Sequence, residues 1–81
     1  MIVKVLGPGC RNCRTLAART REALDGLGIE APIVEVTDVG EIAGYGLMRT
    51  PGLVIDDQLV VGGKVPTVRQ LTELLRGRQT G

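Results

Sequence analysis

Near its N-terminus the chain carries the stretch IVKVLGPGCRNC, residues 2–13. Residues 2–6 form a short apolar run rich in β-branched side chains, and the Gly-Pro-Gly at 7–9 stops it, as expected for a buried strand. From Cys10 to Leu27, apolar side chains recur at helical spacing with charged residues opposite, which predicts an amphipathic helix. A glycine, either Gly26 or Gly28, is expected to close that helix.

The following residues extend this beginning into an α/β structure. Ile33–Val36 reads as a second strand, and a strand-helix-strand run of this length implies a right-handed crossover to a parallel neighbour. Asp38 is expected to cap a short helix through residues 42 and 43. Strands at 53–55 and 58–61 flank Asp56-Asp57, which favours a hairpin even though Asp57 stands where glycine is usual.

A final amphipathic helix is expected behind a capping box of Thr67 and Gln70, running to about Arg76, with residues 77–81 fraying. The predicted order is therefore β-α-β-α-β-β-α. Two parallel strands, an antiparallel hairpin and three helices fit a four-stranded mixed sheet between helices. Because the chain has 81 residues, we expect a single domain over 1–81 with its ordered core at about 2–76.

Composition excludes several classes of function. Tyr45 is the one aromatic residue and the net charge is +1, so stacking platforms and a basic groove for nucleic acid are missing. Histidine is absent, which rules out Ser-His-Asp and Cys-His nucleophile pairs. The first residues lack the charged leader and apolar core of a secretory signal, and no membrane span is found. We therefore expect a cytoplasmic protein with neither nucleic-acid nor membrane partners.

Two cysteines lie at the predicted strand-to-helix junction, Cys10 and Cys13. The first helical turn leaves amide hydrogens without partners, and these amides, the helix macrodipole, Arg11 and Arg14 all favour a thiolate at Cys10. Cys10 is therefore the predicted nucleophile. Cys13 belongs to the apolar stripe and should be more buried, which suits a resolving thiol that attacks a mixed disulfide.

A bridge between these cysteines would close a very short loop, so its contribution to stability would be small. In a reducing compartment such a pair is more often redox-active or metal-binding than a structural staple. A redox dithiol is the favoured interpretation. A soft-metal site and an inert pair remain as alternatives.

Three features in order resemble the thioredoxin superfamily: the Cys-x-x-Cys after the first strand, the stretch Tyr45–Pro51, and the hairpin ending in Gly62-Gly63. The resemblance covers residues 2 to about 76 and is greatest to small thioredoxin- or glutaredoxin-like redox-active disulfide proteins. It implies a thioredoxin-like fold and a cis Thr50–Pro51 bond facing the cysteine pair, with the Thr50 backbone offered to an extended substrate segment. It implies no metal and no cofactor beyond a redox-active Cys10–Cys13 disulfide.

Four other polar or aromatic residues are weighed as possible site residues. No general base is evident, because Glu35 is expected to be solvated in an edge-like strand. Tyr45 is expected to pack at a helix end. Arg49 is expected to be an exposed loop charge that could steer acidic partners. Lys64 follows Gly62-Gly63, where glutaredoxins carry an acidic residue, and is expected to be solvated.

The leading hypothesis is a small thiol-disulfide oxidoreductase that reduces protein or small-molecule disulfides. Its partners would be a disulfide-containing protein substrate and, as electron donor, an external reductase or a low-molecular-weight thiol. One alternative is a soft-metal carrier that binds copper or zinc through the same cysteine pair. A second alternative is an interaction adaptor whose thiols act as a redox-dependent switch.

Overall fold

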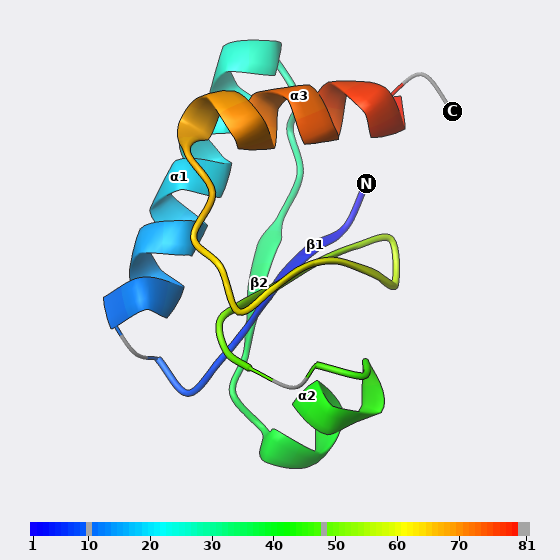
Figure 1. Cartoon of the computed structure of the whole chain (residues 1–81). Coiled ribbons are helices and arrows are strands. Elements are labelled where there is room, and N and C mark those ends of the chain that lie inside the picture. The colour runs from blue at the N-terminus through cyan, green and yellow to red at the C-terminus, as the bar shows by residue number, and fades with distance from the viewer. Residues whose placement is uncertain (10, 48, 80–81) are drawn as a thin grey trace.

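The computed structural model describes residues 1–9, 11–47 and 49–79. The predicted order of elements is confirmed. The elements are, in chain order, β1 (Val3–Leu6), α1 (Arg11–Leu27), β2 (Ile33–Val36), α2 (Val39–Gly44), β3 (Gly52–Ile55), β4 (Gln58–Gly62) and α3 (Val68–Gln79). Figure 1 shows these elements arranged around a single sheet. The first strand begins at Val3, one residue later than the apolar run predicts, and Cys10 lies outside the described residues.

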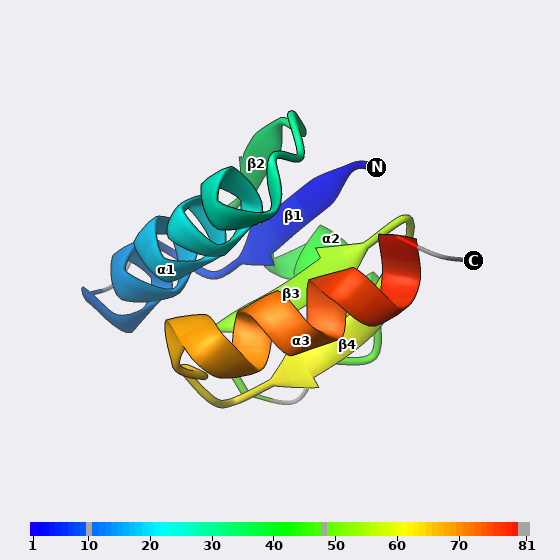
Figure 2. The same ribbon diagram turned by 90° about the horizontal axis from the view of Figure 1, so that it is seen from above.

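The sheet has four strands in the order β2-β1-β3-β4, so β2 and β4 are its edges. Strand β1 runs parallel to β2 and antiparallel to β3, and β3 and β4 form an antiparallel hairpin, as Figure 2 shows. In this register Leu6 lies opposite Gly52, and Gly52 lies opposite Gly62. The segments after Leu6, before Gly52 and after Gly62 therefore leave the sheet at the same end.

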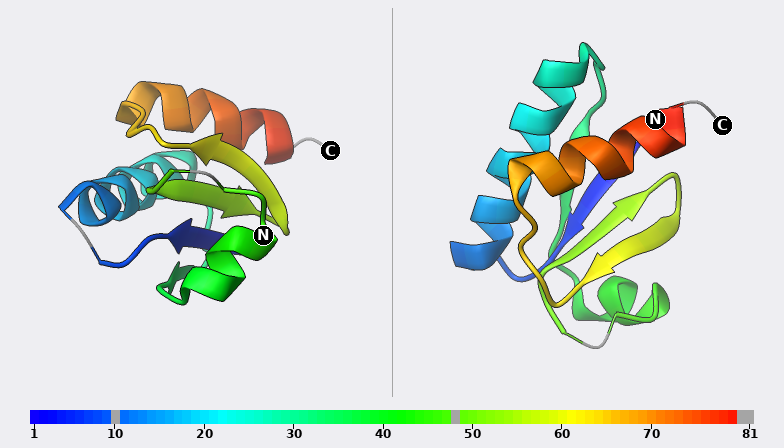
Figure 3. Two further views of the ribbon diagram at one scale, coloured as in Figure 1. Left: turned by 60° about the horizontal axis from the view of Figure 1, so that its bottom comes forward. Right: turned by 45° about the horizontal axis from the view of Figure 1, so that its top comes forward.

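Helices cover both faces of the sheet, with α1 and α3 on one side and α2 on the other (Figure 3). The larger core lies under α1 and α3, and its fully buried members include Val3, Leu16, Leu24, Leu53, Ile55, Leu71 and Leu75. A smaller core under α2 is formed by Leu6, Val36, Ile42 and Val54. Neighbouring residues of β3 alternate between the two cores, as the pleat of a strand requires. The predicted sheet between helices is confirmed.

Local sequence signals account for most ends of the elements. Asp38 accepts a hydrogen bond from the amide of Glu41 at 3.2 Å and caps α2. Thr67 and Gln70 form the predicted capping box of α3, with bonds of 3.0 and 3.1 Å. Gly28, rather than Gly26, closes α1, because its φ of 70° is in the left-handed region that a helix end requires.

The β3–β4 turn is built from two aspartates with positive φ, 49° at Asp56 and 66° at Asp57. Positive φ at both central residues is typical of the type I′ turn, which suits a two-residue hairpin loop. Aspartate tolerates this left-handed region better than most residues do. Asp56 also exchanges two hydrogen bonds with Ile2, each 2.9 Å long. The turn therefore fastens the N-terminus to the sheet.

The predicted end of the last helix is wrong. Helix α3 continues through Gly77 to Gln79 instead of ending near Arg76 and fraying. A glycine ends a helix when it turns to positive φ, and Gly77 is not among the residues with positive φ. An exposed glycine within a helix costs only about 1 kcal/mol, so the last turn persists. The final two residues of the predicted tail, 80 and 81, lie outside the described residues.

Candidate active site

The cysteine predicted to resolve a mixed disulfide lies in the first turn of α1. The side chain of Cys13 is only 3% exposed and belongs to the larger core with Leu16, one turn further along the helix. The burial expected from the apolar stripe is therefore confirmed. Cys10, the predicted nucleophile, lies outside the described residues.

Gly7 is a part of the site that sequence reasoning missed. It is buried at the end of β1, where its amide donates to the carbonyl of Val36 at 2.9 Å. A Cβ placed on Gly7 would collide with the Sγ atom of Cys13. The sequence indicates only that Gly7 helps to stop a strand. The sulfur atom that leaves no room for a Cβ at this position belongs to the neighbouring helix α1.

The loop before β3 reaches the same place. The Thr50–Pro51 peptide bond is cis, Thr50 is exposed and Pro51 is buried. The Cβ of Thr50 would lie 3.7 Å from a Cβ built on Gly7, so Thr50 and the Cys13 sulfur lie on the same side of that glycine. The amide of Gly63 donates to the carbonyl of Pro51 at 2.8 Å, which joins the segment after β4 to this loop. The structure thus brings Cys13, Thr50 and Pro51 together.

Arg11 and Arg14 are exposed in the first turn of α1, near Cys13. That turn contains no acidic residue. A positive charge at a helix N-terminus opposes the macrodipole and does not stabilise the helix. The two arginines therefore add positive potential where the helix amides already favour an anion.

Lys4 and Tyr45 meet away from this site, in the layer of α2. Tyr45 packs against the smaller core and accepts a hydrogen bond from Lys4 Nζ at 2.7 Å, which confirms that it is a packing residue. Lys4 Nζ is also 3.6 Å from a carboxylate oxygen of Asp57. The hydrogen bond to Tyr45, followed by the attraction of Asp57, raises the pKa of Lys4 above its ordinary value. Glu35 is exposed on the edge strand β2, as expected.

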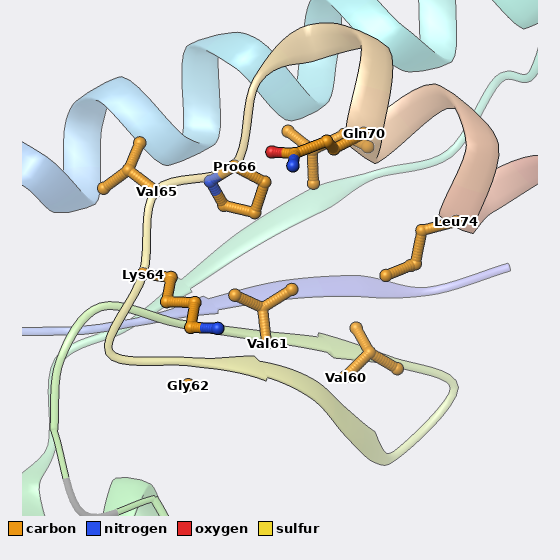
Figure 4. Close-up of a pocket in the computed structure, with 9 residues that line it drawn as sticks. Val60, Val61, Gly62, Lys64, Val65, Pro66, Gln70 and Leu74 are labelled. Atoms are coloured by element: carbon orange, nitrogen blue, oxygen red, sulfur yellow. The ribbon is translucent and has the colours of Figure 1, made fainter.

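Lys64 is one of the residues that line the groove drawn in Figure 4, where its side chain extends toward Val61. The groove has a volume of about 420 Å³ and lies between β4, the loop after it and α3. Its walls combine the apolar Val60, Val61, Val65, Pro66 and Leu74 with polar groups. Lys64 itself is exposed, as predicted.

Within residues 1–9, 11–47 and 49–79, no three histidine, cysteine or carboxylate side chains gather closely enough to hold a metal ion. Over the same residues, no helix is both long and apolar enough to cross a membrane.

Comparison with known proteins adds to this geometry. The family model described as a thioredoxin domain matches residues 1–76. A protein named thioredoxin from Methanocaldococcus jannaschii is 38% identical over 81 residues, which are all of this chain and 93% of the relative. Another protein named thioredoxin, from Methanothermobacter thermautotrophicus, is 33% identical over 75 residues, covering 93% of this chain and 97% of the relative.

Proposed function

The chain belongs to the thioredoxin family, and from this we propose that it is a small thiol-disulfide oxidoreductase that reduces disulfides with Cys10 and Cys13. Family membership supports thiol-disulfide exchange at the level of the family. The assignment of the two cysteines to separate steps is our proposal.

The proposed reaction has two exchange steps. The Cys10 thiolate attacks one sulfur of the substrate disulfide, forms a mixed disulfide and releases the other substrate sulfur as a thiolate. Cys13, deprotonated, then attacks the Cys10 sulfur, so that a Cys10–Cys13 disulfide forms and the second substrate sulfur leaves. The substrate gains two electrons and the cysteine pair loses them. An external reductase or a low-molecular-weight thiol returns two electrons to the pair.

The burial of Cys13 is the single observation that carries this proposal. Because Cys13 as a residue is 3% exposed, its sulfur is poorly accessible to a disulfide arriving from solvent, but it can attack a sulfur already bonded to a nearby residue. This is the property that a resolving thiol needs. Arg11 and Arg14 support the other half of the proposal, because positive charge beside free helix amides favours a thiolate nucleophile.

Thr50 supports a substrate site next to the cysteines. No described residue is hydrogen-bonded to its backbone groups, and the residue is exposed beside Gly7. We propose that an extended substrate segment pairs with this backbone and presents its disulfide to Cys10. A reducing compartment such as the cytoplasm suits a dithiol with this role.

The test is single-turnover reduction of a disulfide peptide by the reduced protein and by Cys10→Ser and Cys13→Ser variants. Loss of Cys10 should abolish reduction. Loss of Cys13 should also prevent release of the second thiol, but it should leave a stable mixed disulfide that mass spectrometry detects on Cys10. Full activity of Cys10→Ser would overturn the assignment of the nucleophile. Absence of any reduction by the folded wild-type protein would favour the redox-switched adaptor.

Alkylation at pH 7 tests the role of the two arginines. An Arg11→Gln, Arg14→Gln double variant should slow alkylation of Cys10 by roughly two- to threefold, since the loss of thiolate is partly offset by greater nucleophilicity. An Arg69→Gln, Arg76→Gln variant makes the same charge change on exposed positions of α3 and serves as the matched control. Equal rates in both double variants would contradict the proposed role.

A further inference from the structure

We propose that Arg49 determines substrate specificity, by selecting disulfide substrates that carry an acidic residue beside the target cysteine. This inference rests on the proposed function and adds the chemical class of the substrate segment. It arises from the position of Arg49 between the Thr50–Pro51 loop and Gly63.

The stem of Arg49 lies close to Gly63. A Cβ built on that glycine would lie 3.1 Å from the Cβ of Arg49, 3.7 Å from its Cδ and 3.9 Å from its Cγ. Gly63 also has a φ of 70°, which most side chains avoid. Since the aliphatic stem lies along Gly63 and the residue is exposed, its charged end remains at the surface.

Arg49 lines a hollow that lies directly beside the candidate active site. This hollow has a volume of about 260 Å³ and reaches from Pro8, in the loop that leads to Cys10, to Thr50. Its other walls are mainly apolar and include Val39, Ile42, Ala43 and Leu47. Val39 is 76% exposed, so its apolar side chain is accessible to a segment that enters the hollow.

The occupant that fits this hollow is an extended segment of a substrate protein. A segment paired with the Thr50 backbone would place one side chain against the apolar wall and a neighbouring one at Arg49. Arg49 also lines a second hollow of about 310 Å³ together with Leu47, Leu59 and Gly62, so it borders both hollows. A carboxylate is the group that the planar guanidinium binds best, through two parallel hydrogen bonds.

The charge around Arg49 favours an acidic partner. In the described part of the chain, the one ion pair joins Lys4 to Asp57, so Arg49 is not neutralised by an acidic side chain of the protein. Asp38 lies between Thr37 and Val39, which both line the hollow, and its carboxylate accepts a hydrogen bond from the amide of Glu41. The segments at this end of the sheet also carry the positive Arg11, Arg14 and Lys64, which together with Arg49 outnumber the acidic Asp38 and Glu41 of the segment after β2. An approaching acidic segment is therefore attracted before it binds.

The test uses peptides with one cysteine, joined as disulfide dimers, that have Glu, Gln or Lys at either position next to the cysteine. Pre-reduced protein is mixed with each dimer in a single turnover, and the released peptide thiol is measured by chromatography. Wild-type protein should reduce the Glu peptide faster than the Lys peptide. Arg49→Gln should lower this rate ratio by roughly two- to fivefold, which is the size of one exposed ion pair, and 1 M salt should do the same.

Charge reversal and a distant control make the result specific. Arg49→Glu should reverse the preference, so that the Lys peptide is reduced faster. Arg76→Gln removes the same charge from the C-terminal part of α3, on the opposite side of the sheet from α2, and should leave the ratio unchanged (Figure 3). An unchanged ratio in both Arg49 variants would overturn the inference while leaving the proposed function intact.

Binding without chemistry separates this inference from the proposed function. Monomeric peptides with methylated cysteines cannot exchange disulfides, and their affinity is measured from amide shifts in NMR spectra. Tighter binding of the Glu peptide that depends on Arg49, without any disulfide reduction, would support the specificity surface and overturn the proposed function. Equal binding of the Glu and Lys peptides, together with equal reduction rates, would overturn the inference alone. Equal binding without reduction would overturn both.

Discussion

Replacing Gly7 with alanine is the sharpest test of how the site is built. The new methyl group would collide with the Sγ atom of Cys13 and lie 3.3 Å from its Cβ. Ordinary contact requires roughly 3.5 to 4 Å, so the sulfur or the strand must move. The sulfur has little space because Cys13 is 3% exposed, and the strand is held by the bond from Gly7 to Val36.

The expected cost is that of overpacking a filled core, about 1 to 3 kcal/mol. For a domain of this size, each kcal/mol lowers the melting temperature by about 4 to 8 °C. Gly7→Ala should therefore melt roughly 5 to 20 °C below wild type. The free energy of unfolding is measured by urea denaturation in reducing buffer, so that both cysteines are thiols in every variant.

Gly26→Ala is the matched control, because nothing lies within 4 Å of a Cβ at that exposed position of α1. It should stabilise the protein by about 0.5 to 1 kcal/mol, as alanine does in a helix. A Cys13→Ala background removes the sulfur and should reduce the penalty of Gly7→Ala to less than about 1 kcal/mol. A penalty that is equally large in that background, or absent in wild type, would refute the reasoning.

Three further changes test other parts of the structure. Thr67→Ala breaks the capping box with Gln70 and should lower the free energy of unfolding by about 1 kcal/mol; an unchanged urea midpoint would contradict this. Leu71→Ala removes a fully buried side chain and should cost about 2 to 5 kcal/mol in the same assay, whereas a loss of under 1 kcal/mol would show that its site collapses. Tyr45→Phe should lower the pKa of Lys4, followed by NMR, toward its ordinary value. A raised lysine pKa stabilises the fold at neutral pH, and that contribution is lost as pH rises from the unfolded-state pKa through the folded-state pKa, so in Tyr45→Phe the loss should be smaller and complete at a lower pH.

Local patterns predict the elements well because their causes are local. The helical stripe from Cys13 to Leu27 has a period that only a helix satisfies, and the caps at Asp38 and Thr67 bond to amides three residues away. The end of α3 is predicted wrongly because glycine permits a helix end without enforcing one. At Gly77 nothing local decides between the two conformations.

The candidate site is predicted only in part. The position of Cys13 on the apolar stripe of α1 gives its burial, and the family resemblance points to Thr50 and Pro51. The close approach of Gly7 to the Cys13 sulfur, and the packing of Arg49 on Gly63, have no signal in the sequence. Each contact joins two segments of the chain. The residues that flank those segments do not indicate how close the two segments lie in the structure.

The sequence by itself determined the kind of protein: an α/β chain with paired cysteines at the start of a helix, where free amides and arginines favour an anion. The tertiary structure decided which residues surround that pair. Gly7 lies close to Thr50, and Gly63 lies close to Arg49 and donates to Pro51, because the register sets Leu6, Gly52 and Gly62 opposite one another across three strands. Register depends on how the whole sheet buries its two faces, since a slip of one residue would turn every side chain to the wrong core.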